Sequence, residues 1–187
     1  MSVNALRQYL EFLKNSGIKE LYLPESNNQK RLNELQHQYS NCTKCSLSQS
    51  RHNFVYGEGN PNALAMLIGE GPGEQEDKTG RPFVGAAGQL LEKMLAAINL
   101  KRSDVYIANI VKCRPPGNRN PEAEERRACL PYLLEQIQII QPKLLLLLGL
   151  VSAQTLLNNN NTLGWHRGKI HYFMDIPALV TYHPSAL

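Results

Sequence analysis

The feature that most constrains the fold of this chain is an alternation of short apolar runs with helical patterns between residues 62 and 187. Strand-like runs occupy residues 64–69, 105–111, 144–149, 169–174 and 178–182, and helical patterns occupy residues 87–99, 122–140 and 151–158. Residues 144–148 are consecutive leucines ended by Gly149, as expected of a strand covered on both faces. The alternation predicts an α/β fold with a mainly parallel sheet and helices on both sides.

The amino-terminal part of the chain has a different pattern. Leu6, Tyr9, Leu10 and Leu13 recur at helical spacing, and a second helix is expected over about residues 29–39. We interpret residues 1–30 as an N-terminal helical extension and residues 31–187 as the main domain.

Length and composition fit one compact domain. The 187 residues are 42% hydrophobic, which suffices for a buried core. No apolar run approaches the roughly 20 residues that cross a bilayer, and the amino terminus lacks the apolar stretch of a signal peptide. We therefore expect a cytoplasmic, nucleoid-associated protein without a membrane partner. The net charge of +4 slightly favours a polyanionic partner.

A glycine-rich acidic segment follows the first strand-like run: Gly69-Glu70-Gly71-Pro72-Gly73-Glu74-Gln75-Glu76-Asp77. Glycine lets a ligand approach the backbone, and α/β folds bind ligands outside the carboxyl ends of their strands. The carboxylates would repel phosphate, and no Gly-Lys-Ser/Thr sequence follows. The segment is predicted to be an active-site loop whose carboxylates handle protons, water or a base edge. An acidic, solvent-exposed turn is the alternative.

Four cysteines form a second constellation. Cys42 and Cys45 are separated by two residues, and Cys113 and Cys129 follow from distant segments. A pair with this spacing can bind one metal centre from a single turn, which the other two can complete. Zinc held by four thiolates and an iron–sulfur cluster both fit, and two unrelated buried pairs are the remaining alternative.

Three further residues have side chains suited to a flat polar ligand. Phe83 can stack on such a ligand or belong to the core. The Asn109 carboxamide offers a donor and an acceptor to a base edge, or is satisfied by the backbone. His183 ends the last strand-like run, on the ligand side of the predicted sheet.

Two basic stretches suit phosphate contacts. Residues 112–121 contain Lys112, Arg114 and Arg119 without an acidic residue. A solvent-exposed loop is the alternative for this stretch. The segment Trp165-His166-Arg167, with Lys169, adds a second basic patch.

Taken together, these segments resemble the family 4 uracil-DNA glycosylases, the iron–sulfur members of their superfamily. The motifs that carry the resemblance are residues 69–77, Gly80-Arg81-Pro82-Phe83-Val84-Gly85, Asn109-Ile110-Val111-Lys112-Cys113-Arg114-Pro115-Pro116, Asn118-Arg119-Asn120-Pro121 and His183-Pro184-Ser185-Ala186-Leu187. They occur in the family's order over about residues 38–187, together with all four family cysteines.

The resemblance implies a three-layer αβα sandwich with a four-stranded parallel sheet, and a 4Fe–4S cluster on Cys42, Cys45, Cys113 and Cys129. It implies a base excision repair enzyme that hydrolyses the N-glycosidic bond of uracil in single- or double-stranded DNA, leaving an abasic site. We expect it to act as a monomer.

The resemblance also implies roles for individual residues. Phe83 stacks on the flipped uracil, Asn109 reads its edge, and His183 faces uracil O2, where negative charge grows. Glu76 positions the water. The remaining implied contacts are the backbone of Glu70 and Gly71, which approaches the base, and Asn118, a supporting polar residue.

Two departures from the family pattern stand out. The family core lacks the extension of residues 1–30, and it continues with Leu-Arg and a closing helix after the position of Leu187, so we expect a truncated carboxyl end. The alternative functions are a non-catalytic iron–sulfur module that binds nucleic acid, and a nucleotide-binding or redox protein that uses the glycine loop.

Overall fold

The computed structural model describes residue 16 and residues 27–187, so the helix expected around residues 6–13 lies outside the described residues. The helices and strands are α2 (Asn27–Tyr39), β1 (Glu58–Gly59), β2 (Ala65–Gly69), α3 (Glu74–Thr79), α4 (Ala86–Ala97), β3 (Tyr106–Asn109), α5 (Ala123–Ile140), β4 (Leu144–Leu148), α6 (Leu150–Leu157), α7 (Leu163–His166), β5 (Ile170–Phe173) and β6 (Ile176–Thr181). Short 3-10 turns lie at Ser46–Gln49, Arg102–Asp104, Pro116–Asn118 and Pro184–Ala186. None of these helices is both long and apolar enough to cross a membrane.

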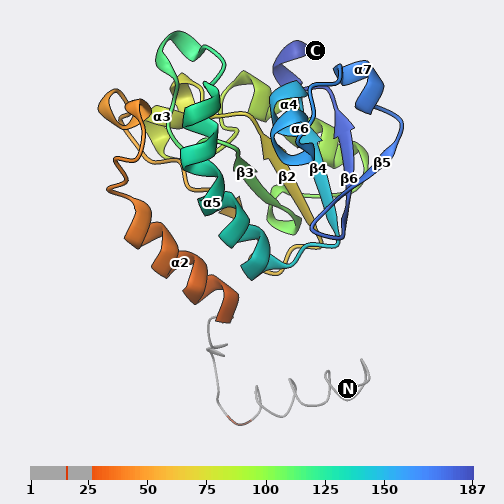
Figure 1. Cartoon of the computed structure of the whole chain (residues 1–187). Coiled ribbons are helices and arrows are strands. Elements are labelled where there is room, and N and C mark those ends of the chain that lie inside the picture. Colours follow the sequence, from red (N-terminus) through yellow and green to blue (C-terminus); the bar gives the residue numbers. More distant parts are fainter. Residues whose placement is uncertain (1–15, 17–26) are drawn as a thin grey trace.

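The centre of the molecule is a six-stranded sheet with the order β1-β3-β2-β4-β6-β5 (Figure 1). The neighbours β3, β2, β4 and β6 are parallel, which confirms the four parallel strands expected. The edge strands β1 and β5 pair antiparallel and bring the total to six. The sequence did not indicate β1, because two residues are too few to show an alternating pattern.

Helices cover both faces of the sheet, as the apolar strands require. Met66, Leu145 and Leu147 join a core cluster with residues of α2, α5 and α6. Leu67 and Leu148 face the other way, into a cluster with α4. Figure 1 shows α5 in front of the sheet, with the α4 segment behind it. The expected three-layer arrangement is confirmed.

Helix α2 packs on this core. Leu32 is buried, and the Tyr39 hydroxyl donates to both carboxylate oxygens of Glu135 on α5, at 3.0 and 2.9 Å. The helix begins at Asn27, so its first turn lies before the expected domain boundary at residue 30.

The acidic segment differs from the expected loop, because residues Glu74–Thr79 form the short helix α3. Gly73 caps its amino end and Gly80 its carboxyl end, the latter with the left-handed φ of 74° that glycine adopts without strain. The acidic side chains in its first turn suit the positive end of the helix dipole. The carboxylates thus stabilise a helix beside the ligand edge of the sheet.

Candidate active site

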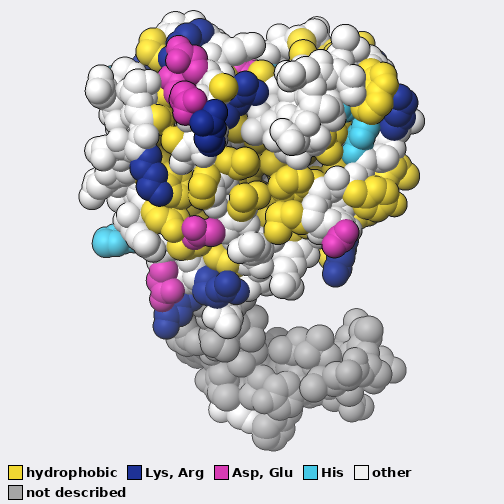
Figure 2. All heavy atoms as spheres, viewed as in Figure 1, with side chains coloured by type: hydrophobic (Ala, Val, Ile, Leu, Met, Phe, Trp, Pro, Cys, Tyr) yellow, Lys and Arg dark blue, Asp and Glu magenta, His cyan; other side chains and the backbone are white. Residues whose placement is uncertain are grey.

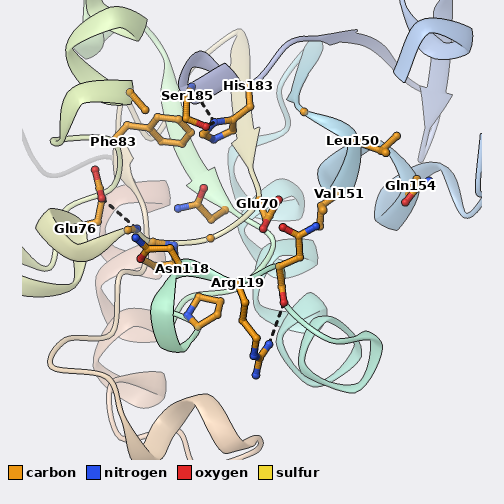
Figure 3. A pocket seen from close by; sticks show the side chains of 18 residues that line it. Glu70, Glu76, Phe83, Asn118, Arg119, Leu150, Val151, Gln154, His183 and Ser185 are labelled. Carbon is orange, nitrogen blue, oxygen red and sulfur yellow. Dashed lines mark hydrogen bonds between the residues drawn. The ribbon is translucent and has the colours of Figure 1, made fainter. Parts of the chain in front are cut away.

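A pocket of about 450 Å3 lies at the carboxyl ends of the parallel strands. It is lined by every residue expected to act in catalysis or substrate binding: Glu70, Gly71, Glu76, Phe83, Asn109, Asn118 and His183. Figure 3 shows that the labelled side chains, among them Glu76, Phe83 and His183, surround one space although they are far apart in the sequence. The start of α6 contributes Leu150, Val151 and Gln154, which carry no sequence signal of a binding role.

Asn109, at the end of β3, presents an unused acceptor to the pocket. Its side chain is buried, with 1% of the residue exposed, and Oδ1 has no hydrogen-bond partner among the described residues. A buried carbonyl oxygen without a partner is unfavourable unless a ligand or water donates to it. The alternative that Asn109 is satisfied by the backbone therefore does not hold for Oδ1.

Gly69 allows the two side chains next to it to approach the end of β2. A Cβ atom there would lie 2.5 Å from Asn109 Oδ1 and 2.6 Å from Phe83 Cζ, closer than real Cβ contacts. Only a residue without a Cβ atom at position 69 thus leaves room for Asn109 and Phe83 in the pocket wall.

Phe83 and His183 form the aromatic part of the pocket. Their ring centroids lie 5.5 Å apart with the planes tilted by 34°, and Figure 3 shows the two rings facing the same space. Phe83 has a positive φ of 51°, an uncommon conformation for a bulky residue. Arg102 donates to the carbonyls of Phe83 and Pro82, which helps to hold this backbone.

The contacts of His183 define its tautomer. The backbone N–H of Ser185 donates to His183 Nδ1 at 3.2 Å, and the Ser185 hydroxyl lies 2.7 Å from the same atom. Nδ1 therefore acts as an acceptor, and the proton of the neutral ring is on Nε2. Burial lowers the pKa of His183 from its ordinary value, which favours this neutral form.

Glu76 is held by backbone N–H groups. Oε1 accepts from Val84 and Gly85, each at 2.8 Å, and Oε2 accepts from Gly73 at 3.1 Å. A carboxylate has about four acceptor positions, so one position on Oε2 remains for a ligand or water. The same bonds tie α3 to the amino end of α4.

Glu70 follows β2 and lines the same pocket. Burial raises its pKa above the ordinary value of 4.5, and the nearby charge of Arg126 opposes the shift only in part. The carboxyl group is thus placed in surroundings that disfavour its charged form.

In the stretch of residues 112–121, the cations expected to contact phosphates have internal partners, and Lys112 is too deeply buried for such a contact. Lys112 is fully buried and donates to the Asn109 carbonyl at 3.0 Å and to Gln136 Oε1 at 2.7 Å; burial lowers its pKa to about 8. Arg119 makes paired bonds of 2.8 and 2.7 Å to Glu125. Arg114 donates to Asn118 Oδ1 at 2.8 Å.

The four cysteines line one small cavity between the turn after α2, the segment after β3 and α5. Three of the sulfur atoms accept hydrogen bonds: Cys42 from the Tyr132 hydroxyl at 2.9 Å, Cys113 from Arg51 at 3.3 Å and Cys129 from the Lys112 backbone at 3.2 Å. Among the described residues, no three His, Cys, Asp or Glu side chains converge closely enough to hold a metal ion. Four thiols around a cavity, most of them beside donors that stabilise thiolates, suit a larger centre such as an iron–sulfur cluster.

The fold and this pocket are those of an α/β enzyme whose ligand pocket lies at the carboxyl edge of a parallel sheet. The sequence model of the uracil DNA glycosylase superfamily matches residues 56–187. The type-4 uracil-DNA glycosylase of Pyrobaculum aerophilum is 45% identical over 164 residues, which are 83% of this chain and 84% of that protein. That of Thermotoga maritima is 44% identical over 155 residues, 78% of this chain and 77% of that protein.

A type-5 uracil-DNA glycosylase of Pyrobaculum aerophilum is more distant, with 32% identity over 146 residues, 69% of this chain and 64% of that protein. The chain therefore belongs to the uracil DNA glycosylase superfamily and, within it, to the type-4 group. The resemblance seen in the sequence motifs is confirmed.

Proposed function

We propose that this protein is a DNA repair enzyme that hydrolyses the N-glycosidic bond of uracil in DNA, releasing uracil and leaving an abasic site. The observation that carries the proposal is the meeting, in one pocket, of the unpartnered Asn109 Oδ1, the Phe83 ring and a neutral histidine with its proton on Nε2. Uracil presents the complementary groups: an N3–H donor, a flat ring and the O2 acceptor.

Asn109 and Phe83 recognise the base. Asn109 Oδ1 accepts from uracil N3–H, and its amide group donates to O4, so cytosine, which lacks the N3–H, is disfavoured. The Phe83 ring stacks on the base. These contacts, with the Glu70–Gly71 backbone beside them, offset the few kcal/mol needed to take uracil out of the DNA stack.

Bond cleavage leaves negative charge on uracil and positive charge on the sugar. His183 Nε2–H donates to uracil O2, where the charge develops. Groups that bind the developing charge more strongly than the intact base contribute most to catalysis. Because Nδ1 is occupied by Ser185, the ring cannot turn without breaking those contacts.

The attacking water is assigned to Glu76. The acceptor position left on Oε2 orients the water, while the three backbone bonds keep the carboxylate in place. Asn118 supports this side of the pocket, since Arg114 holds its Oδ1 and leaves its amide group for the substrate.

Cys42, Cys45, Cys113 and Cys129 would hold a 4Fe–4S cluster. When bound, it supplies iron–thiolate bonds that tie the turn after α2 to α5 and to the segment after Asn109. Burial raises the pKa of Cys129 to about 12, so the free thiol keeps its proton at neutral pH, and a bound metal centre would displace that proton.

We assign catalysis to a domain of residues 31–187, with residues 1–30 as an extension. We propose that the enzyme acts as a monomer. A DNA substrate places the enzyme at the nucleoid in the cytoplasm.

The test is uracil release from a DNA strand that contains a single uracil, beside a strand with thymine at that position. We expect free uracil and an abasic site from the first strand only. Binding without release would favour the non-catalytic nucleic-acid module, and absence of both would overturn the proposal.

A further inference from the structure

Aromatic and basic side chains gather beside the pocket, on α7, the loop to β5 and the end of β6. We call this set the aromatic-basic strip; its members are Trp165, Arg167, Lys169 and Tyr182. Trp165 is 46% exposed and Tyr182 39% exposed, and both cations are exposed. Figure 2 shows hydrophobic, basic and histidine side chains side by side at the upper right, over α7.

The strip lies at the same edge of the sheet as the pocket. Strand β5 pairs antiparallel with β6, and Ile170 at its start pairs with Leu179 near the end of β6. The segment before β5 therefore lies at the carboxyl end of β6. Arg167 reaches it directly, since its guanidinium carbon lies 3.9 Å from the centre of the Tyr182 ring. Tyr182 is followed by His183, which lines the pocket.

The two cations of the strip are held in place by ring faces and have no acidic partner within residues 27–187. Lys169 Nζ lies 4.0 Å from the centre of the Trp165 ring. No carboxylate of the described residues forms an ion pair with Arg167 or Lys169. Asp175, the single acidic residue in residues 141–187, lies at the far end of the β5–β6 hairpin. A cation already held over a ring loses less entropy when it binds a phosphate.

This contrasts with the basic residues on the opposite rim of the pocket. Arg119 is paired with Glu125, and Arg114 lies 3.8 Å from Glu74. A polyanion that reaches the pocket therefore meets unpaired positive charge at the strip. Exposed aromatic rings interleaved with such cations are the features that hold single nucleic-acid strands, through base stacking and phosphate contacts.

We propose that the aromatic-basic strip binds the DNA strand on one side of the flipped uracil. Arg167 and Lys169 contact its phosphates, and Trp165 and Tyr182 stack on its bases. This inference rests on the proposed function, because the flipped base fixes where the strand enters the pocket. It assigns to the strip a strand-holding role that is separate from base recognition by Asn109.

The test compares the full chain with the variant Arg167→Gln/Lys169→Gln on single-stranded oligonucleotides. Each oligonucleotide carries 2′-fluoro-2′-deoxyuridine, which resists cleavage. Three versions are compared: one with two long flanks, one with a shortened 5′ flank and one with a shortened 3′ flank. We expect the variant to bind the long oligonucleotide roughly tenfold more weakly or worse, with a logarithmic salt slope that is shallower by roughly 0.7 for each phosphate that it no longer binds. Shortening one flank, and only that one, should make variant and parent bind alike.

The matched control is Arg31→Gln/Lys143→Gln, which removes the same charge from α2 and from the amino end of β4. It should bind like the parent on all three oligonucleotides. A second variant, Tyr182→Leu, should weaken binding with the same flank dependence but leave the salt slope unchanged. Unfolding temperatures check that each variant is folded. If the double variant is not folded, the single variant Lys169→Gln replaces it.

Two results would overturn the strip proposal. One is a double variant that binds like the control; the other is a weakening that persists whichever flank is shortened, which indicates general charge attraction. Uracil release by the parent is measured in parallel on the cleavable strand. Uracil release without a flank-specific effect on binding would contradict the strip proposal alone, whereas absence of uracil release would contradict the proposed function.

Discussion

At the scale of single residues, the pocket contains two kinds of polar atom: those that are hydrogen-bonded within the protein and those that are available to a ligand. Nδ1 of His183 and three of the four acceptor positions of Glu76 are used within the protein. Asn109 Oδ1 has no partner among the described residues, although it is buried. The hydrogen bonds within the protein fix the orientation of the His183 and Glu76 side chains, and the acceptors without a partner are available to the substrate.

His183→Ala should slow uracil release at saturating enzyme by roughly 100-fold, because it removes a donor that acts on charge formed in the transition state. Binding of uracil DNA should change little. Single-turnover rates and dissociation constants on one oligonucleotide measure the two effects. His37→Ala, at an exposed histidine of α2, is the control. Weak binding with fast release would assign His183 to DNA contact instead.

Glu70→Gln should stabilise the fold at neutral pH. Burial raises the pKa of Glu70 above 4.5, so between 4.5 and the raised value the folded state binds more protons than the unfolded state. Stability therefore falls as pH rises through this window and stays lower above it. The glutamine variant does not titrate, so its gain in unfolding temperature should be present at about pH 7 and vanish below about pH 4.5.

The control for this prediction is Glu34→Gln, at an exposed position of α2. It should show no comparable gain at either pH. A Glu70→Gln variant that is less stable than the parent at neutral pH would contradict the view that burial disfavours this carboxylate.

At the scale of elements, the parallel strands and the meeting of Glu70, Asn109 and His183 could be predicted, because apolar runs are local properties of the sequence and parallel strands end at the same edge of a sheet. The burial of Lys112 could not, since its partner Gln136 comes from α5. The pairing of Arg119 likewise depends on how α5 brings Glu125 against the loop. Helix α3 was missed because the bonds that hold it, from residues 84 and 85 to Glu76, come from beyond its own end.

Gly69→Ala should displace the pocket residues Asn109 and Phe83, which pack against the end of β2. The new Cβ would overlap Asn109 Oδ1 and Phe83, and overpacking of this kind costs about 1–3 kcal/mol. We expect a lower unfolding temperature together with weaker uracil discrimination. Gly164→Ala, where a Cβ meets nothing within 4 Å, is the control. Normal activity in Gly69→Ala would show that the wall adjusts freely.

At the scale of the whole molecule, the four cysteines connect parts of the fold that are distant in sequence. They bring the turn after α2, the segment after β3 and α5 around one cavity. The segment after β3 also carries Lys112, which donates to the Asn109 carbonyl. A centre bound there would therefore stabilise the region that supports the pocket.

Cys113→Ser should lower the iron content, remove the visible absorbance of a cluster and reduce the unfolding temperature, because metal binding contributes to folding. Tyr132→Phe is the matched control, since it removes one hydrogen bond to Cys42 but no thiol. Iron analysis, absorbance and thermal unfolding measure the effects. A Cys113→Ser protein with unchanged iron and stability would contradict the cluster assignment, and zinc without iron in the parent would favour the zinc site.

The order in which the pocket residues occur along the chain also bears on when the enzyme becomes active in the cell. The pocket begins at Glu70 but is not complete until β6 has placed His183 and Ser185. Chains fold from the amino end as the ribosome releases them, and contacts between distant segments form slowly. A nascent chain that still has β6 inside the ribosome can present Phe83 and Asn109 but lacks the histidine. If His183 acts as proposed, we expect uracil release to begin only after the last parallel strand has left the ribosome.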